Sequence, residues 1–158
     1  MEITSLSNPK LKFVVKLRSC STREETKEMI VEGYRECRRA LDAGYRPKSI
    51  FHCPSLYLKN ENESSLVEEC IRRGAQEFCC SKACFQKIAY RERPDGLLMV
   101  GPHITVTLDS LKLPANPLVV VTEAIEKPGN LGSMLRSADA VNASGVIICE
   151  KGTDIYNP

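Results

Sequence analysis

The stretch that decides the fold spans residues 117–151 and reads PLVVVTEAIEKPGNLGSMLRSADAVNASGVIICEK. An apolar run at 117–124 is followed by a Pro-Gly turn, then by about a dozen residues with helical spacing, and then by a second apolar run at 145–151. This order predicts a βαβ unit, with parallel strands in a buried sheet. Ligands of such sheets bind outside the carboxyl ends of the strands, so we expect chemistry near Glu123, Asn130 and the start of the helix.

The turn and the helix carry the residues of interest. Asn130 stands where a helix N-cap would, which predicts a helix that begins at Leu131. Arg136 lies on the face shared with Gly132, Ser133 and Ala140, where a large ligand could approach. Spacings of three and four predict one buried apolar stripe, made of Leu131, Met134, Leu135, Ala138 and Val141.

The turn matches neither of the familiar phosphate-binding loops. The pattern GxGxxG would need a third glycine, and GxxxxGK[ST] would need a lysine after its last glycine. A nucleotide-binding Rossmann fragment stays open as an alternative, with Glu150 as its acidic ribose ligand.

The segment EKPGNLGSMLRSADAVNASGVII resembles the first signature of the SpoU (TrmH-like) RNA 2′-O-ribose methyltransferases. Two departures are Val141-Asn142-Ala143, where aromatic-glycine-alanine is usual, and Ser137, where threonine is commoner. Upstream, ITSLSNPKLKFVVKLRS, TREETKEMIVEGYRECRRAL and FQKIAYRERPDGLLMV resemble the N-terminal substrate-binding domain that many members carry. The matching signature positions are Gly129, Asn130, Gly132, Arg136, Ser137, Ala138, Gly145 and Val146.

The resemblance implies transfer of a methyl group from S-adenosylmethionine to a ribose 2′-hydroxyl of rRNA or tRNA. It implies catalytic roles for Arg136 and Asn130, with the signature arginine as the proposed base. Because a guanidinium stays protonated, we expect Arg136 to bind the neighbouring phosphate and stabilise the developing alkoxide, while Asn130 holds the loop and the ribose. The structural alternatives are an ion pair of Arg136 with Asp139 and a plain N-cap at Asn130. A trefoil knot and a homodimer of the whole enzyme are also implied.

The resemblance and the element pattern divide the chain at its middle. We expect an α/β fold: an RNA-binding domain at 1–101, a linker at 102–117, and the start of a knotted, SPOUT-type parallel-sheet domain at 118–158. Residues 59–65 are predicted to form a polar loop. Predicted strands lie at 28–33, 49–54, 76–81 and 96–102, and predicted helices at 9–19, 34–44, 64–74 and 82–89.

Two later signatures of the family, which build its cofactor loops and knot, do not occur in the sequence. We therefore expect the N-terminal portion of a longer enzyme, or a product whose sheet another chain completes. The residues that bind S-adenosylmethionine are accordingly expected beyond Pro158. The chain itself should bind this cofactor weakly or not at all and should not methylate RNA. The alternative function is a non-catalytic RNA-binding module.

Composition favours an ordinary globular protein, with 42% hydrophobic and 27% charged residues. No apolar run approaches a membrane span, which predicts a cytoplasmic protein without a membrane partner. The eight cysteines show no CxxC pair, so buried free thiols are favoured over disulfides or zinc and no metal is expected. Cys37 and Cys149 are included among these buried thiols.

Net charge is only +2, but basic residues gather near the N-terminus. In 34–46, Tyr34, Cys37 and Leu41 are predicted to face the core while arginines turn outward. A solvated helix face is the plain alternative, and the resemblance favours phosphate contacts instead. The predicted RNA-binding residues are Lys10, Lys12, Arg18, Arg35, Arg38 and Arg39.

Overall fold

The computed structural model describes residues 2–59, 61–104, 106–150 and 152–157, and it divides into two compact units. Unit 1 reaches to His103, and unit 2 spans Ile104–Asn157. Unit 1 contains a five-stranded sheet in the order β1-β4-β3-β5-β2. The strands are β1 (Glu2–Ile3), β2 (Glu28–Glu32), β3 (Ser49–His52), β4 (Gln76–Cys80) and β5 (Leu97–Pro102).

The division into units can be compared with the predicted domains at their inner boundary. Unit 1 ends two residues after the predicted limit at 101, and most of the predicted linker at 102–117 belongs to unit 2. The predicted outer limits, Met1 and Pro158, lie outside the described residues, so the structure describes the second domain only as far as Asn157.

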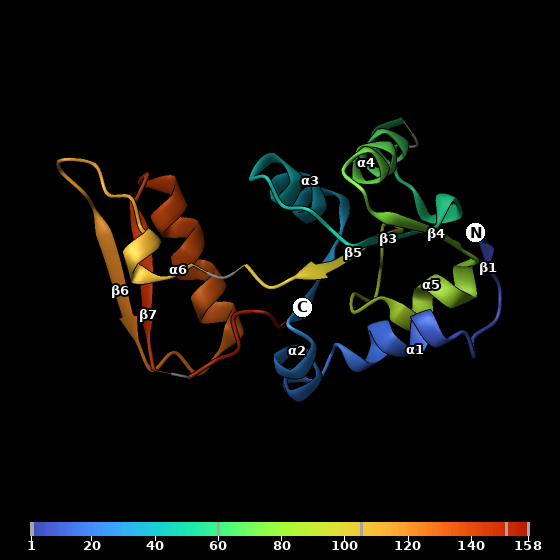
Figure 1. The fold of residues 1–158 in the computed structure, drawn as a ribbon, viewed down its shortest axis with the longest axis horizontal. Helices are drawn as coiled ribbons and strands as arrows, with labels where there is room; N and C mark the ends of the chain where they lie inside the picture. Colours follow the sequence, from blue (N-terminus) through green and yellow to red (C-terminus); the bar gives the residue numbers. More distant parts are fainter. Residues whose placement is uncertain (1, 60, 105, 151, 158) are drawn as a thin grey trace. The chain divides into compact units, whose positions relative to one another are not determined.

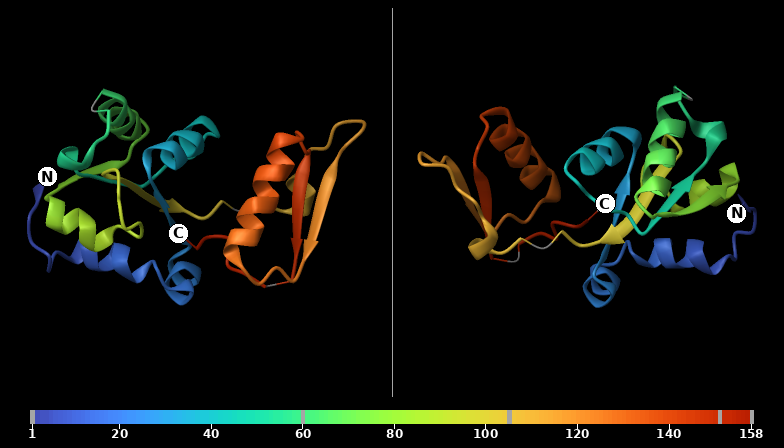
Figure 2. Two further views of the ribbon diagram at one scale, coloured as in Figure 1. Left: turned by 180° about the vertical axis from the view of Figure 1, so that it is seen from behind. Right: turned by 45° about the horizontal axis from the view of Figure 1, so that its top comes forward.

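Helices cover both faces of the sheet of unit 1, as Figures 1 and 2 show. One face carries α1 (Pro9–Lys16) and α5 (Lys82–Ile88), and the other carries α3 (Tyr34–Asp42) and α4 (Glu61–Arg72). Strands β1, β3 and β4 run parallel, whereas β5 is antiparallel to both of its neighbours, β2 and β3. The carboxyl ends of β2 and β3 therefore lie at the same edge of the sheet, beside the start of β5.

The core of unit 1 follows the alternation of side chains along the central strands. Leu98 and Val100 of β5 join the cluster beneath α1 and α5, together with the stacked rings of Phe51 and Phe78, whose centroids lie 4.9 Å apart. Met99 points to the other face, where its Sδ lies 3.6 Å from the Sγ of Cys70 in α4. Both faces are buried, as a sheet covered by helices on both sides requires.

Most predicted elements of unit 1 are confirmed, with differences at three places. Strand β1 and helix α2 (Cys20–Thr26) were not predicted. Residues 61–65 belong to α4 rather than to the predicted polar loop, and the remaining loop position 60 lies outside the described residues. Acidic residues in the first turn, Glu61 and Glu63, complement the helix dipole and explain why a polar stretch becomes helical.

Unit 2 contains the predicted βαβ unit. Strand β6 (Val119–Glu123) pairs in parallel with β7 (Gly145–Cys149), and α6 (Pro128–Ala140) connects them. The predicted strand at 145–151 ends at Cys149, and position 151 lies outside the described residues. The 3₁₀ turn η2 (Leu108–Ser110) comes from the predicted linker, and Leu111 next to it packs against Gly145.

Two predictions about α6 are wrong. The helix begins at Pro128 with Lys127 as its N-cap residue, so Asn130 lies inside the first turn and does not cap it. Proline at N1 has φ preset for a helix, which explains the earlier start. Of the predicted apolar stripe only Leu131 and Ala138 are buried, whereas Met134, Leu135 and Val141 are exposed.

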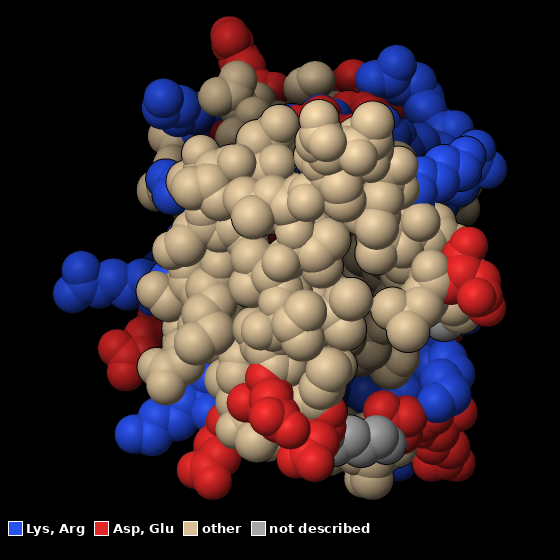
Figure 3. Space-filling model, turned by 90° about the vertical axis from the view of Figure 1, so that its left-hand side faces the viewer, with Lys and Arg blue, Asp and Glu red and all other residues tan. Residues whose placement is uncertain are grey.

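The sheet of unit 2 is not buried on both faces as predicted. Val120 faces α6, whereas Val121, on the opposite face, is 62% exposed. Figure 3 views the molecule from the side of β6 and shows a broad area free of Lys, Arg, Asp and Glu side chains. Within the described part of the chain, β6 and β7 pair only with each other.

Candidate active site

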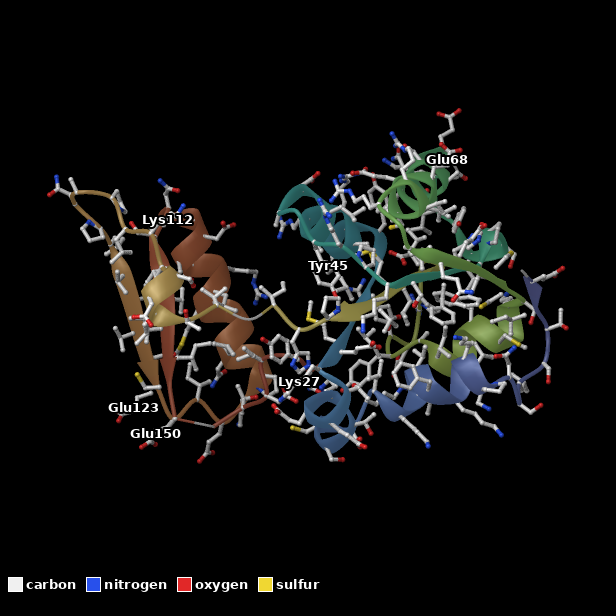
Figure 4. All side chains as sticks on the ribbon, viewed as in Figure 1. Lys27, Tyr45, Glu68, Lys112, Glu123 and Glu150 are labelled. Atoms are coloured by element: carbon white, nitrogen blue, oxygen red, sulfur yellow. The ribbon has the colours of Figure 1, made fainter. Side chains whose placement is uncertain are left out.

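At the carboxyl edge of the β6–β7 pair, each strand is followed by a residue with a strained backbone, Ala124 after β6 and Glu150 after β7. Glu123 ends β6 and Glu150 follows β7, and Figure 4 shows both at the same end of the unit, their side chains exposed. Ala124 and Glu150 have left-handed backbones, with φ of 50° and 62°. Such conformations cost non-glycine residues of order 1–2 kcal/mol and gather at functional sites. The two loops then touch each other at Ile125 and Gly152, where a Cβ on Gly152 would overlap the backbone of Ile125.

Asn130 lies where the resemblance expects it, above this edge. Its side chain is exposed, and it lines two open hollows of about 470 and 350 Å³. The first runs along α6 past Ser133 and Ser137, and the second lies over the loop at 123–127. An exposed amide between two hollows can donate to and accept from a ribose or a phosphate.

Arg136 is exposed on the small-residue face predicted for it. Its Nη1 reaches back over Gly132, where a Cβ would lie 3.5 Å away. The alternative ion pair with Asp139 is not formed, and no carboxylate among the described residues pairs with this guanidinium. The guanidinium is therefore available for an anionic ligand.

The structure does not bring Asn130 and Arg136 together within unit 2. Six residues of an α-helix separate their side chains by about 120° around the axis. Arg136 borders neither of the two hollows that Asn130 lines.

The cofactor-binding residues were expected beyond Pro158, and Pro158 itself lies outside the described residues. Their position therefore stays a prediction.

Two of the predicted RNA-binding arginines, Arg18 and Arg38, have hydrogen-bond partners within unit 1. Arg18 does not face solvent freely, since its Nη2 donates to the carbonyl oxygens of Lys87 and Ala89 at 3.1 and 2.6 Å, at the C-terminus of α5. Arg38 turns away from the core as predicted, but its side chain is only 31% exposed because it meets two carboxylates. Its guanidinium donates to Asp42 at 2.6 Å and to Glu69 of α4 at 2.5 Å. Arg73 also pairs with Glu69, and these arginines lower the pKa of Glu69 to about 2.

The other four predicted basic residues are exposed on helices. Lys10 lies over the ring of Phe78, with Nζ 5.7 Å from the centroid, a cation–π contact that leaves its charge near solvent. Lys12, Arg35 and Arg39 have no ion-pair partner within the described ranges. Helical spacing thus predicted which residues turn away from the core, but not which of them meet a carboxylate or a carbonyl.

The cysteines largely follow the buried-thiol interpretation. All eight are free, and Cys37, Cys53, Cys70, Cys80 and Cys84 are buried. Burial raises the pKa of the Cys80 thiol to about 12. Cys149 is exposed, so the prediction that it is buried is wrong. The described residues contain no group of three or more His, Cys, Asp or Glu placed to hold a metal ion.

Sequence reasoning missed Ala124, Ile125 and Gly152, which shape the loops below Asn130. Their types give little signal, because alanine in a left-handed conformation is not encoded by composition. The single available cue was Gly152, three residues after Cys149 at the end of β7.

Two protein families match consecutive parts of the chain. Residues 8–99 match the MRM3-like substrate binding domain, and residues 117–158 match the SpoU rRNA Methylase family. In the structure, no helix among the described residues is both long and apolar enough to cross a membrane.

Curated relatives and solved structures agree with these matches. The 23S rRNA (guanosine(2553)-2′-O)-methyltransferase RlmP of Bacillus subtilis is 26% identical over 156 residues, which are 99% of this chain and 57% of the relative. The human mitochondrial rRNA methyltransferase 3 is 26% identical over 146 residues, which are 90% of this chain and 33% of the relative. The chain thus spans little more than half the length of the first of these.

The structural matches extend over nearly the whole chain. An rRNA methyltransferase from Sinorhizobium meliloti superposes with a TM-score of 0.87 at 25% identity, covering 99% of this chain and 57% of that one. The same enzyme has been solved with AdoMet bound. An RNA 2′-O ribose methyltransferase superposes with a TM-score of 0.79 at 31% identity, covering 100% of this chain and 58% of that one. The chain therefore belongs to the SpoU/TrmH family of RNA methyltransferases, with an MRM3-like substrate-binding domain followed by the start of the SpoU domain.

Proposed function

We propose that the protein to which this chain contributes transfers a methyl group to a ribose 2′-hydroxyl of ribosomal RNA, with tRNA as the second candidate. The observation that carries the proposal is the free guanidinium of Arg136 on α6, at the signature position, with Asn130 exposed about 1.7 turns earlier. Relatives named for 2′-O-methylation of 23S rRNA support the choice of RNA.

The chemistry explains why an arginine and an asparagine suit this site. When bound, S-adenosylmethionine supplies an electrophilic methyl group. A ribose hydroxyl must lose its proton as it attacks, so negative charge develops on O2′. Arg136 would bind the neighbouring phosphate and stabilise that charge, and Asn130 would hold the ribose hydroxyls.

We assign this chain the RNA-binding part and the Asn130 and Arg136 part of the site, and place the cofactor-binding residues beyond Pro158. The homodimer, the trefoil knot and the cytoplasmic location implied at the outset stay predictions within this proposal. A non-catalytic RNA-binding module is the second candidate, favoured by the separate core of unit 1.

The proposal is tested by methyl transfer to rRNA and tRNA under single-turnover conditions, with saturating AdoMet and with a protein of the relatives' full length. We expect Arg136→Ala to lower the rate on the order of 100- to 1,000-fold. The thermal midpoint should barely move, because truncating an exposed side chain costs well under about 1 kcal/mol.

Lys112→Ala is the matched control, since it removes an exposed positive charge at the end of unit 2 opposite Glu123 and Glu150, as Figure 4 shows. Near-normal turnover in Arg136→Ala would show that Arg136 is an ordinary solvent-exposed helix residue without a catalytic role. The 158-residue chain alone should neither methylate RNA nor bind AdoMet in calorimetry. Saturable micromolar binding would overturn the assignment of the cofactor site.

A further inference from the structure

Unit 1 contains a hollow of about 420 Å³ that borders one of the predicted RNA-binding residues, Arg35. It lies where β2 and β3 end and β5 begins. Its walls come from the first turn of α3, from the residues on either side of the start of α4, and from the loop before β5, and they include Tyr34, Arg35, Leu58, Lys59, Glu63 and Asp95. Its volume falls within the roughly 300–1,000 Å³ typical of pockets for small ligands. The carboxyl ends of parallel strands are also where α/β sheets bind ligands.

Three inward-facing carboxylates fix these three segments. Glu32 accepts from the backbone N–H groups of Tyr90 and Arg91 at 2.6 and 3.3 Å. Asp95 accepts from the N–H of Tyr34 at 2.7 Å, at the first turn of α3. Such contacts preorganise a pocket in the absence of its ligand.

The third carboxylate holds the loop before α4. Glu63, 2% exposed, accepts from the N–H groups of Leu58 and Lys59, both at 3.0 Å. These bonds use only Oε1. Glu63 Oε2 and Asp95 Oδ1 are buried and have no hydrogen-bond partner within the described part of the chain.

Cations border the same hollow. Arg35 and Lys59 are exposed and without an ion-pair partner among the described residues. Arg91 pairs with Glu36 at 2.9 Å and lies against Gly33, whose φ is 102°. The walls thus combine positively charged side chains with two carboxylate oxygens, Glu63 Oε2 and Asp95 Oδ1, that accept no hydrogen bond from the described residues.

This combination selects the ligand class. A bare phosphate would satisfy the cations but bring no donor to Glu63 or Asp95. A nucleotide brings acceptors on its phosphate and donors on its base edge and 2′-hydroxyl. Leu58, 80% exposed, and the half-buried ring of Tyr34 offer apolar surface to a base.

We propose that this hollow binds one unpaired nucleotide of the RNA substrate, with its phosphate on Arg35 and Lys59 and a base edge bearing an amino group facing Glu63 and Asp95. The inference rests on the proposed RNA substrate and names how unit 1 recognises it. Guanine fits best, because N1–H and N2–H₂ present adjacent donors on one edge. RNA contact then centres on the start of α3 rather than on α1.

The probe is a fluorescein-labelled oligouridine, compared with the same oligomer carrying guanosine, or inosine, at its centre. Anisotropy titrations of the whole chain should show the guanosine oligomer binding about tenfold more tightly than the other two, because inosine lacks the N2 amino group. Amide shifts in ¹H–¹⁵N spectra should concentrate at Tyr34, Leu58, Lys59 and Arg91.

Two variants separate the two halves of the pocket. Arg35→Ala combined with Lys59→Ala should weaken every oligomer at least tenfold and lower the salt slope by roughly 0.7 per lost phosphate contact. Glu63→Gln keeps an oxygen for Leu58 and Lys59 and replaces Oε2 by an amide NH₂. It should erase the guanosine preference and leave oligouridine binding unchanged, and Asp95→Asn repeats the test should Glu63→Gln fail to fold.

Arg72→Ala is the control for the loss of a positive charge away from the hollow, since Arg72 is exposed at the far end of α4. An equal loss in Arg72→Ala, amide shifts confined to α1, or an unchanged preference in Glu63→Gln would overturn the pocket. If the full-length protein still methylates RNA in those cases, the proposed function stands without it. If no RNA binds to the chain and none is methylated by the full-length protein, both fall.

Discussion

Gly33 is the residue on which the geometry around the start of α3 depends most closely. Its φ of 102° and ψ of 146° lie in a region that only glycine adopts readily. A Cβ there would overlap the guanidinium of Arg91 and a carboxylate oxygen of Glu36. Position 33 therefore requires glycine for two reasons: the backbone has a positive φ, and no space is left for a side chain.

We expect Gly33→Ala to destabilise the chain by about 1–3 kcal/mol, chiefly through backbone strain. Gly74→Ala isolates that strain, because Gly74 has a φ of 95° with no atom within 4 Å of a built Cβ. Urea unfolding should find both variants destabilised, whereas a shifted Arg91 side-chain signal should appear only in Gly33→Ala. An unmoved Arg91 signal there would contradict the described packing.

For single residues, the sequence predicts which face of a helix a side chain lies on better than it predicts which residue that side chain contacts. Periodicity placed Arg35, Arg38 and Arg39 on one side of α3, as the helix requires. It gave no sign that Glu69, from a helix 31 residues further along, would reach Arg38. Side-chain partners depend on which elements pack together, which a pattern within one element does not contain.

Among the elements, α1 and α5 are joined by hydrogen bonds from Arg18, one of the predicted RNA-binding residues. The last carbonyls of a helix have no intrahelical donor and carry partial negative charge. Arg18, just past α1, supplies donors to two carbonyl oxygens at the end of α5. Its cation therefore stabilises a helix terminus, and a contact of Arg18 with RNA stays a prediction.

Arg18→Ala should accordingly lower the free energy of unfolding by about 1–2 kcal/mol, since two charged hydrogen bonds to carbonyls are lost. Lys12→Ala, an exposed lysine on α1, should change it by less than about 0.5 kcal/mol. Chemical denaturation of the two variants compares them directly. Equal stabilities would mean that the Arg18 contacts contribute nothing in solution.

Element type was predictable where the apolar period was strong, and element ends were not. The central strands β2 to β5 and the helices α1, α3 and α5 follow clear patterns of burial. α4 begins earlier than predicted because Glu63 turns inward to bind backbone amides. α6 begins at Pro128, so Asn130 lies in the first turn of the helix with its side chain exposed and does not cap it.

On the scale of the whole molecule, the two units differ in how completely they bury their apolar residues. The core cluster of buried residues lies within unit 1, between its sheet and the helices α1 and α5. In unit 2, a single helix covers one face of two strands, and several large apolar side chains are exposed. Two strands and a helix are close to the limit of independent stability.

We expect a chain ending at His103 to fold cooperatively, with a thermal midpoint within a few degrees of that of the whole chain. Residues 104–158 alone should give poorly dispersed amide spectra, because their buried apolar surface does not offset chain entropy. Differential scanning calorimetry and ¹H–¹⁵N spectra of both pieces test this. A well-dispersed spectrum of the second piece would show that unit 2 is self-sufficient.

The open edges of β6 and β7 have a consequence for how the chain behaves at high concentration. A strand that pairs on one side only leaves a row of N–H and C=O groups that can template another chain. The sequence LVVVT around β6 combines β-branched residues with no charge, the composition of segments that stack into cross-β fibrils. Unless something covers that edge, we expect concentrated solutions of the 158-residue chain to aggregate from β6 long before the fold of unit 1 is lost.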